Sequence, residues 1–172
     1  MKTGSEARAA PPGTERPSVR VAVVMERIAE PNRWQAWGHR VAEVVLQEDA
    51  FGTEPHVLRD DGKSRLTLHP GFTLALFRDA AQGYWLNLTS GAPVWFVVWR
   101  VDDEDPSRAW PETVSLSYEE AGRWLDAQEH VDNAPLQPEI VAWLQAYTDA
   151  NYRPEPRERR RPQSFLSPEQ RG

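Results

Sequence analysis

The chain has 172 residues, with 20 basic and 26 acidic side chains, eight tryptophans and no cysteine. This length is typical of one domain, and a domain of that size buries about 70% of the surface that its unfolded chain exposes. The lack of cysteine excludes disulfides, thiolate zinc ligands, a cysteine nucleophile and iron–sulfur ligation by this chain. The net charge of −6 argues against a general nucleic-acid binder, because such a protein presents a basic surface.

The charge is unevenly distributed along the chain. Residues 1–17 hold three prolines and no large apolar side chain apart from Met1, so we expect this segment to be disordered. Residues 153–172 are rich in proline and arginine, and we expect them to form a disordered tail with a charge of +3. The N-terminal segment carries +1, so residues 18–152, the expected single domain, carry −10. The sequence therefore predicts an acidic domain with a basic arm.

The chain shows no targeting or membrane signal. No apolar run approaches the 18 residues that mark a membrane-spanning helix, and residues 1–17 lack the apolar stretch of a secretory signal. We therefore expect a cytoplasmic protein without a membrane partner.

Alternating apolar residues predict strands through much of the chain. The expected strands are Val19–Met25, a segment within 34–46, and shorter runs at 66–68, 72–77, 84–89 and 94–101, separated by turn residues at 60–63, 69–71, 79–83 and 91–93. The run at 94–101 is apolar on both faces, which is typical of a central strand buried on both sides. Connections this short favour antiparallel hairpins.

The apolar period changes after one more strand, Thr113–Ser117. Ser117 and Glu120 form a capping box for a helix of about ten residues. Pro138 suits the first position of a second helix, whose apolar stripe ends near Tyr152. Strands followed by helices predict an α+β fold: an antiparallel β meander or small barrel of six to eight strands followed by two C-terminal helices.

Several runs of residues carry a resemblance to a known family. They are VAVVMER at 21–27, NRW at 32–34, LHPGFTLALFRD at 68–79, GYWLNLTS at 83–90, VWFVVWRVD at 94–102, VSLSYEEAGRWLD at 114–126 and VDNAPLQPEIVAWLQAYTDANY at 131–152. In this order, and over about residues 18–160, they resemble the uncharacterised bacterial family called domain of unknown function 3305. The resemblance implies a place beside genes for molybdenum-dependent formate dehydrogenase and its maturation factors, and it assigns no catalytic residues.

The resemblance leads us to expect a non-catalytic accessory protein that assists assembly or maturation of a molybdenum-dependent formate dehydrogenase. Its protein partner is then a subunit of that enzyme or a maturation factor. The alternative is an enzyme of molybdopterin guanine dinucleotide biosynthesis, or a carrier that binds this cofactor. A guanylyltransferase needs a glycine-rich phosphate loop, and the sequence holds neither G-x-G-x-x-G nor G-x-x-x-x-G-K-[ST]. We therefore favour the accessory protein, with no cofactor of its own.

Candidate contact residues are tryptophans and arginines near predicted turns, loops and strand ends. They are Arg33, Trp34, Trp37, Arg78, Arg100 and Trp110. A partly exposed indole often anchors a protein interface, and arginines at strand ends can bind phosphate or carboxylate. The alternatives are that Trp34 and Trp37 close one end of the domain, and that each of these strand-end arginines pairs with a neighbouring aspartate.

The tail contributes a basic cluster of four arginines: Arg157, Arg159, Arg160 and Arg161. Such arms bind acidic partners, nucleic acid or membrane. The −10 charge of the domain makes nucleic acid the weakest candidate for this chain. The four histidines lack metal-ligand spacing, and the acidic run 102–105 lacks the glycine and trailing glutamate of a calcium loop. We therefore expect neither a metal site nor catalytic residues.

Overall fold

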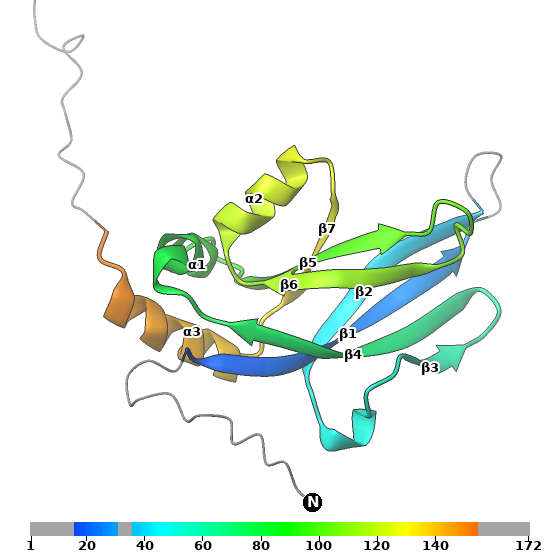
Figure 1. Cartoon of the computed structure of the whole chain (residues 1–172), viewed down its shortest axis with the longest axis horizontal. Helices are drawn as coiled ribbons and strands as arrows, with labels where there is room; N and C mark the ends of the chain where they lie inside the picture. The colour runs from blue at the N-terminus through cyan, green and yellow to red at the C-terminus, as the bar shows by residue number, and fades with distance from the viewer. Residues whose placement is uncertain (1–15, 31–35, 155–172) are drawn as a thin grey trace, which may run out of the picture.

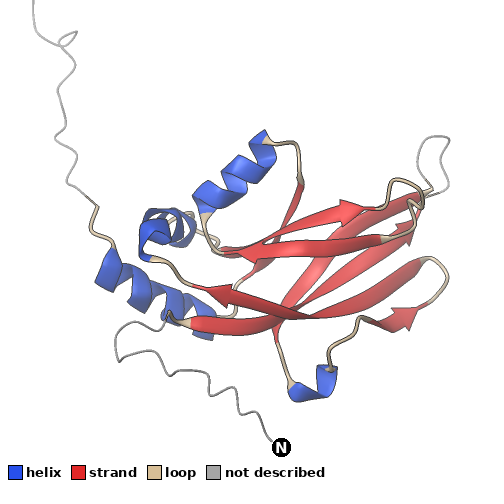
Figure 2. Cartoon of the chain, viewed as in Figure 1, coloured by secondary structure: helices blue, strands red, loops and turns tan. Residues whose placement is uncertain are grey.

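The computed structural model describes residues 16–30 and 36–154, and these form an α+β fold as the sequence predicts. The described residues hold two antiparallel sheets and three α-helices. The two sheets stay separate, so the expected barrel is not closed within this part of the chain. The helices gather at one end of the sheets, and the strand hairpins extend toward the other end (Figures 1 and 2).

The first sheet has the strand order β2-β1-β4-β3. Its strands are β1 (Ser18–Ala29), β2 (Trp37–Leu46), β3 (His56–Asp60) and β4 (Ser64–Ala75). β4 is one strand where the sequence predicts two, because the turn signal at 69–71 bends the strand without ending it. Gly71 adopts a φ of 97°, which glycine tolerates, and the pairing with β1 shifts register between Val21 and Val23.

The second sheet has the strand order β6-β5-β7. Its strands are β5 (Val94–Val101), β6 (Ala109–Ser115) and β7 (His130–Pro135). β5 is central and buried on both faces, which confirms its predicted role. Trp110 and Pro111 lie inside β6 although we expected a loop there; β6 is an edge strand, where proline is tolerated. β7 was not predicted, because its sequence HVDNAP shows little apolar alternation.

Three α-helices occur in the described residues: α1 (Ala81–Leu88), α2 (Tyr118–Asp126) and α3 (Pro138–Asn151). α2 and α3 are the two predicted C-terminal helices. Ser117 caps α2 as expected, since its Oγ accepts a hydrogen bond from the Glu120 N–H at 3.2 Å. Pro138 begins α3, where its missing N–H leaves no bond unmade. No helix in this part of the chain is long and apolar enough to cross a bilayer.

α1 occupies the segment for which alternation predicts a strand, and that prediction is wrong. Tyr84, Leu86 and Leu88 alternate, but Ala81, Tyr84 and Leu88 also recur at helical spacing. In the structure these last three residues pack against the main core. A segment this short satisfies both periods, so apolar pattern alone does not separate them.

The buried side chain of Asn87 ties α1 to the second sheet. Its Nδ2 donates to the carbonyls of Val94 and Leu116, each at 2.9 Å, and its Oδ1 accepts from the Val94 N–H at 3.0 Å. These bonds satisfy three backbone groups, two at the start of β5 and one at the start of the β6–α2 connection. A helix presents Asn87 to these groups together with the apolar residues of the same face.

The main core lies between the two sheets. Its buried members from β1 and β5 are Val21, Val23, Met25, Trp95, Val97 and Trp99. The opposite face of β5 carries Phe96, whose ring meets Tyr118 of α2 edge-on with centroids 6.1 Å apart. β5 is therefore enclosed by the first sheet on one side and by α2 on the other.

Two polar side chains of the second sheet and its connection to α3 bond the backbone of β2. Asp132 Oδ2 accepts from the Val41 N–H at 2.8 Å. Gln137 Nε2 donates to the Val44 carbonyl at 2.7 Å, and its Oε1 accepts from Trp95 Nε1 at 3.0 Å. These bonds hold β2 beside β7. They also satisfy polar groups that would otherwise be buried without hydrogen-bond partners.

We expect Asn87→Ala to lower the free energy of unfolding by roughly 3 kcal/mol, because it leaves one buried and two partly buried backbone groups without their Asn87 partner. Denaturant unfolding followed by tryptophan fluorescence measures this change. The matched control is Gln82→Ala on the exposed side of α1, which we expect to shift stability by about 0.5 kcal/mol or less. Equal losses in the two variants would contradict the role given to Asn87.

Candidate functional site

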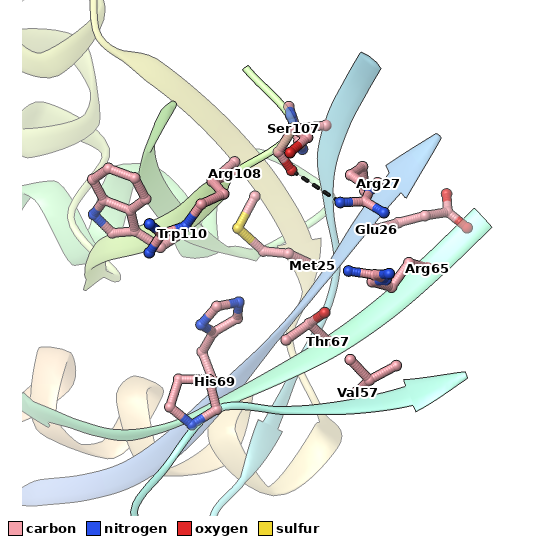
Figure 3. Close-up of a pocket in the computed structure, with 13 residues that line it drawn as sticks. Met25, Glu26, Arg27, Val57, Arg65, Thr67, His69, Ser107, Arg108 and Trp110 are labelled. Carbon is pink, nitrogen blue, oxygen red and sulfur yellow. Dashed lines mark hydrogen bonds between the residues drawn. The ribbon is translucent and has the colours of Figure 1, made fainter. Parts of the chain in front are cut away.

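A cleft of about 360 Å³ opens between β1, β3 and β4 of the first sheet and the β5–β6 hairpin of the second (Figure 3). We call it the cationic cleft. The lining side chains used below are Met25, Arg27, Val57, Arg65, Thr67, His69, Arg108 and Trp110. Arg108 and Trp110 come from the hairpin side, whereas Arg65, Thr67 and His69 come from β4 (Figure 3).

The cleft begins where the apolar face of β1 ends. Val21, Val23 and Met25 lie on the face that meets the second sheet, and all three are buried in the core. Arg27 is the next residue on this face, and its charge cannot be buried without a partner. The same strand face therefore builds the core over one stretch and the cleft over the next.

Three basic residues form a row across three neighbouring strands. Arg27 of β1 pairs in register with His39 of β2 on one side and with Arg65 of β4 on the other. Side chains directly opposite in an antiparallel pair lie about 5 Å apart at Cβ, and like charges there are destabilising. Burial, followed by the charge of Arg65, lowers the pKa of the Arg27 guanidinium.

Arg27 is held in place by an aromatic ring and by a backbone carbonyl. Its guanidinium lies 4.2 Å from the centroid of the Trp37 ring, and its Nη1 donates to the Ser107 carbonyl at 3.3 Å. Its Nε is buried and has no hydrogen-bond partner among the described residues. Trp37, a predicted contact residue, therefore supports a cleft arginine and is not itself part of the cleft lining.

Arg65 and Arg108 are oriented by carboxylates at the rim. Arg65 Nε donates to Asp60 Oδ2 at 2.8 Å, and Arg108 Nη1 lies 3.9 Å from Asp102 Oδ2. All four side chains keep substantial contact with solvent, so water screens both pairs and leaves them weak. The arginines can exchange these partners for a stronger anion.

His69 contributes a neutral group to the cleft. Its half-buried imidazole has a pKa lowered from 6.5 to about 4, because burial disfavours the charged form. At pH 7 the ring is therefore a neutral hydrogen-bonding group. It lies on the same face of β4 as Thr67 and Arg65.

Arg100 and Trp110 meet a common carboxylate on β6. Arg100 Nη2 donates to Glu129 Oε1 at 3.2 Å, and its Nε lies 3.9 Å from Glu112 Oε2. Trp110 Nε1 donates to the same Glu112 oxygen at 3.2 Å. Arg100 thus pairs with acids, and these acids are glutamates from other segments instead of the neighbouring aspartates that the sequence suggests.

The other predicted contact residues are not brought to the cleft. Arg78 is exposed in a short 3₁₀ turn, Arg78–Ala80, which leads into α1 at the helical end of the molecule. Arg100 lies near the opposite end of β5, so these two arginines do not form a pair. Arg33, Trp34 and the tail arginines lie outside the described residues.

The acidic run 102–105 closes the β5–β6 hairpin. Asp102 Oδ1 accepts from the backbone N–H groups of Glu104 and Asp105, at 2.9 and 3.3 Å. Asp105 Oδ1 accepts from the N–H and the hydroxyl of Ser107, at 3.1 and 2.6 Å. These carboxylates shape the turn that places Arg108 over the cleft.

Sequence reasoning missed Arg27, Arg65 and Arg108. The alternation of side chains along β1 could have pointed to Arg27, because Arg27 lies on the same face of the strand as Val21, Val23 and Met25. The other two arginines carry no local signal, since only strand pairing and the hairpin bring them to the cleft.

The lowered pKa of His69 predicts a loss of stability in acid. The unfolded chain binds the histidine proton near pH 6.5, whereas the folded chain binds it near pH 4, so the contribution is complete above pH 6.5 and is lost as pH falls toward 4. We expect the stability advantage of the wild type over His69→Gln to shrink by on the order of 1–2 kcal/mol between pH 7 and pH 4, after solvent screening.

Denaturant unfolding of both proteins at several pH values measures this difference. The exposed His56 on β3 supplies the control, because we expect His56→Gln to follow the wild type over the whole range. Parallel curves for His69→Gln and the wild type would overturn the assignment of a neutral, buried imidazole.

Comparison with known proteins adds the family. No curated protein and no solved structure matches the chain. A family model does match, over residues 20–161, which takes in the strands and helices described above except the first two residues of β1. This match agrees with the resemblance seen in the sequence, and the chain belongs to the family described as protein of unknown function (DUF3305).

Proposed function

We propose that this protein is a non-catalytic accessory protein that assists assembly or maturation of a molybdenum-dependent formate dehydrogenase. Membership of the family supports this proposal, because the resemblance implies a place beside the genes of that enzyme. The observation that carries the binding role is the cationic cleft, where Arg27, Arg65 and Arg108 line one cavity. The protein acts by binding a ligand or a charged group of its partner there.

The chemistry of the cleft favours binding over catalysis. A guanidinium stays protonated at every physiological pH, so the three arginines can hold an anion but cannot take up its proton. A general base works best with a pKa near the working pH, and the pKa of His69 is about 4. The side chains of the cleft are therefore suited to recognition.

One observation favours a second candidate, a carrier that binds the molybdopterin cofactor or its nucleotide. A cavity of about 360 Å³ falls in the size range of small-molecule sites, which begins at about 300 Å³. The cleft is thus large enough for part of a ligand of this class. The cleft favours a carrier over an enzyme of cofactor biosynthesis, because its arginines and its neutral His69 suit binding and not proton transfer.

We expect deletion of the gene in the native host to lower formate dehydrogenase activity, with the amount of the enzyme's polypeptide unchanged. Activity per enzyme polypeptide and molybdenum content measure this effect. The wild-type gene and an Arg59→Gln variant, altered outside the cleft on β3, should restore activity, whereas Arg65→Gln with Arg108→Gln should not. Normal activity and normal cofactor loading in the deletion strain would contradict the proposed function.

A further inference from the structure

We infer that the cationic cleft is a binding site for a small organic phosphate, with the phosphate held by Arg27, Arg65 and Arg108 and a flat ring packed beside Trp110. The inference rests on the proposed function only in taking the cleft as the site of binding. It goes further by naming the chemical class of the ligand.

The charge inside the cleft is positive although the domain is acidic. Three arginines line the cavity, and Glu26 is the carboxylate that lines it with them. Glu26 is already bound, because Arg40 Nε donates to its Oε1 at 2.6 Å and Ser64 Oγ donates to its Oε2 at 2.8 Å. These bonds lower the pKa of Glu26 and engage its charge from outside the lining.

The placement of Arg27 opposite Arg65 favours binding of an anion that bridges the two guanidinium groups. Like charges directly opposite on neighbouring strands repel, and this repulsion is relieved when one anion binds both guanidinium groups. Arg27 Nε is a buried donor without an acceptor among the described residues. Phosphate supplies several oxygens and up to two negative charges, so it can satisfy more of these donors than a carboxylate can.

No carboxylate of the described residues forms an ion pair with Arg27, although the charges of Asp60 and Asp105 favour its protonated form. Asp60 and Asp102 do not line the cleft and keep contact with solvent; Asp60 Oδ2 accepts from Arg65 Nε, and Asp102 Oδ2 lies 3.9 Å from Arg108 Nη1. Asp105 accepts its hydrogen bonds from Ser107. These groups therefore hold Arg65 and Arg108 in position, while Arg27 Nε keeps no acceptor among the described residues.

The apolar part of the lining selects an organic ligand over a free ion. Val57 of β3 is 51% exposed, and the half-buried Trp110 ring stands on the hairpin side (Figure 3). The buried Met25 adds an apolar surface between the two sheets. A flat ring joined to the phosphate can lie against Val57 and Trp110 and remove their exposed surface from water.

Calorimetric titration of the full chain with phenyl phosphate tests the inference, with phenol, benzoate and inorganic phosphate as comparison ligands. We expect phenyl phosphate to bind at one site with a Kd of about 1 mM or below, and each comparison ligand to bind at least tenfold more weakly. Benzoate binding as tightly as phenyl phosphate would overturn the phosphate class. Equal binding of inorganic phosphate would overturn the organic part, and no binding of phenyl phosphate would overturn the whole inference.

Variants place the site within the molecule. We expect Arg65→Gln and Arg108→Gln each to weaken binding of phenyl phosphate at least tenfold, while Arg59→Gln changes it less than twofold. Arg59 is the matched control, because it is exposed on β3 and pairs with Leu66, one residue from Arg65. Thermal melts establish that the variants are folded, and equal effects of all three variants would overturn the site.

The outcomes separate this inference from the proposed function. Binding of phenyl phosphate without an effect of gene deletion on formate dehydrogenase supports the ligand class and contradicts the accessory role. A deletion effect without binding of phenyl phosphate contradicts the ligand class and leaves the accessory role supported.

Discussion

The hydrophobic core to which β1 and β5 both contribute is the interaction on which the rest of this structure depends. Trp95 and Val97 of β5 and Val21 and Val23 of β1 are buried in one hydrophobic core, which lies between the two sheets. Past Met25, the same face of β1 carries a charged guanidinium, and there the sheets enclose a cleft. The protein therefore places a binding surface on the continuation of its own core strand, where a rigid backbone fixes the position of Arg27.

Hydrogen bonds around the shared core explain why the two sheets take one fixed position relative to each other. Asp132 and Gln137 bond the backbone of β2 across the sheets, and the buried Asn87 bonds α1 to the start of β5. Such bonds allow few alternatives, because a shifted strand leaves buried polar groups without partners. The helices gather at one end of the sheets, whereas the β5–β6 hairpin extends toward the other end, and no residue of α1, α2 or α3 lines the cleft.

Much of the fold is readable from the sequence, and the failures have physical reasons. The doubly apolar pattern of 94–101 identifies the central strand, and Ser117 and Pro138 mark the starts of two helices. α1 is missed because its pattern fits two periods, and because Asn87 finds its partners outside the helix, at Val94 and Leu116. The cleft is missed because Arg65 and Arg108 meet only through strand register and a hairpin, which no local pattern encodes.

The most direct test of the central claim is a nuclear magnetic resonance titration of isotope-labelled protein with phenyl phosphate, observing side-chain N–H signals. If the cleft holds the phosphate and the ring as inferred, the signals of the Trp110 indole and of the Nε–H groups of Arg27 and Arg65 shift together along one saturation curve. The indole of Trp143, which lies on α3 at the helical end, should stay unchanged. Saturation without a shift at Trp110 or the two arginines, or with the largest shifts at Trp143, would contradict the account.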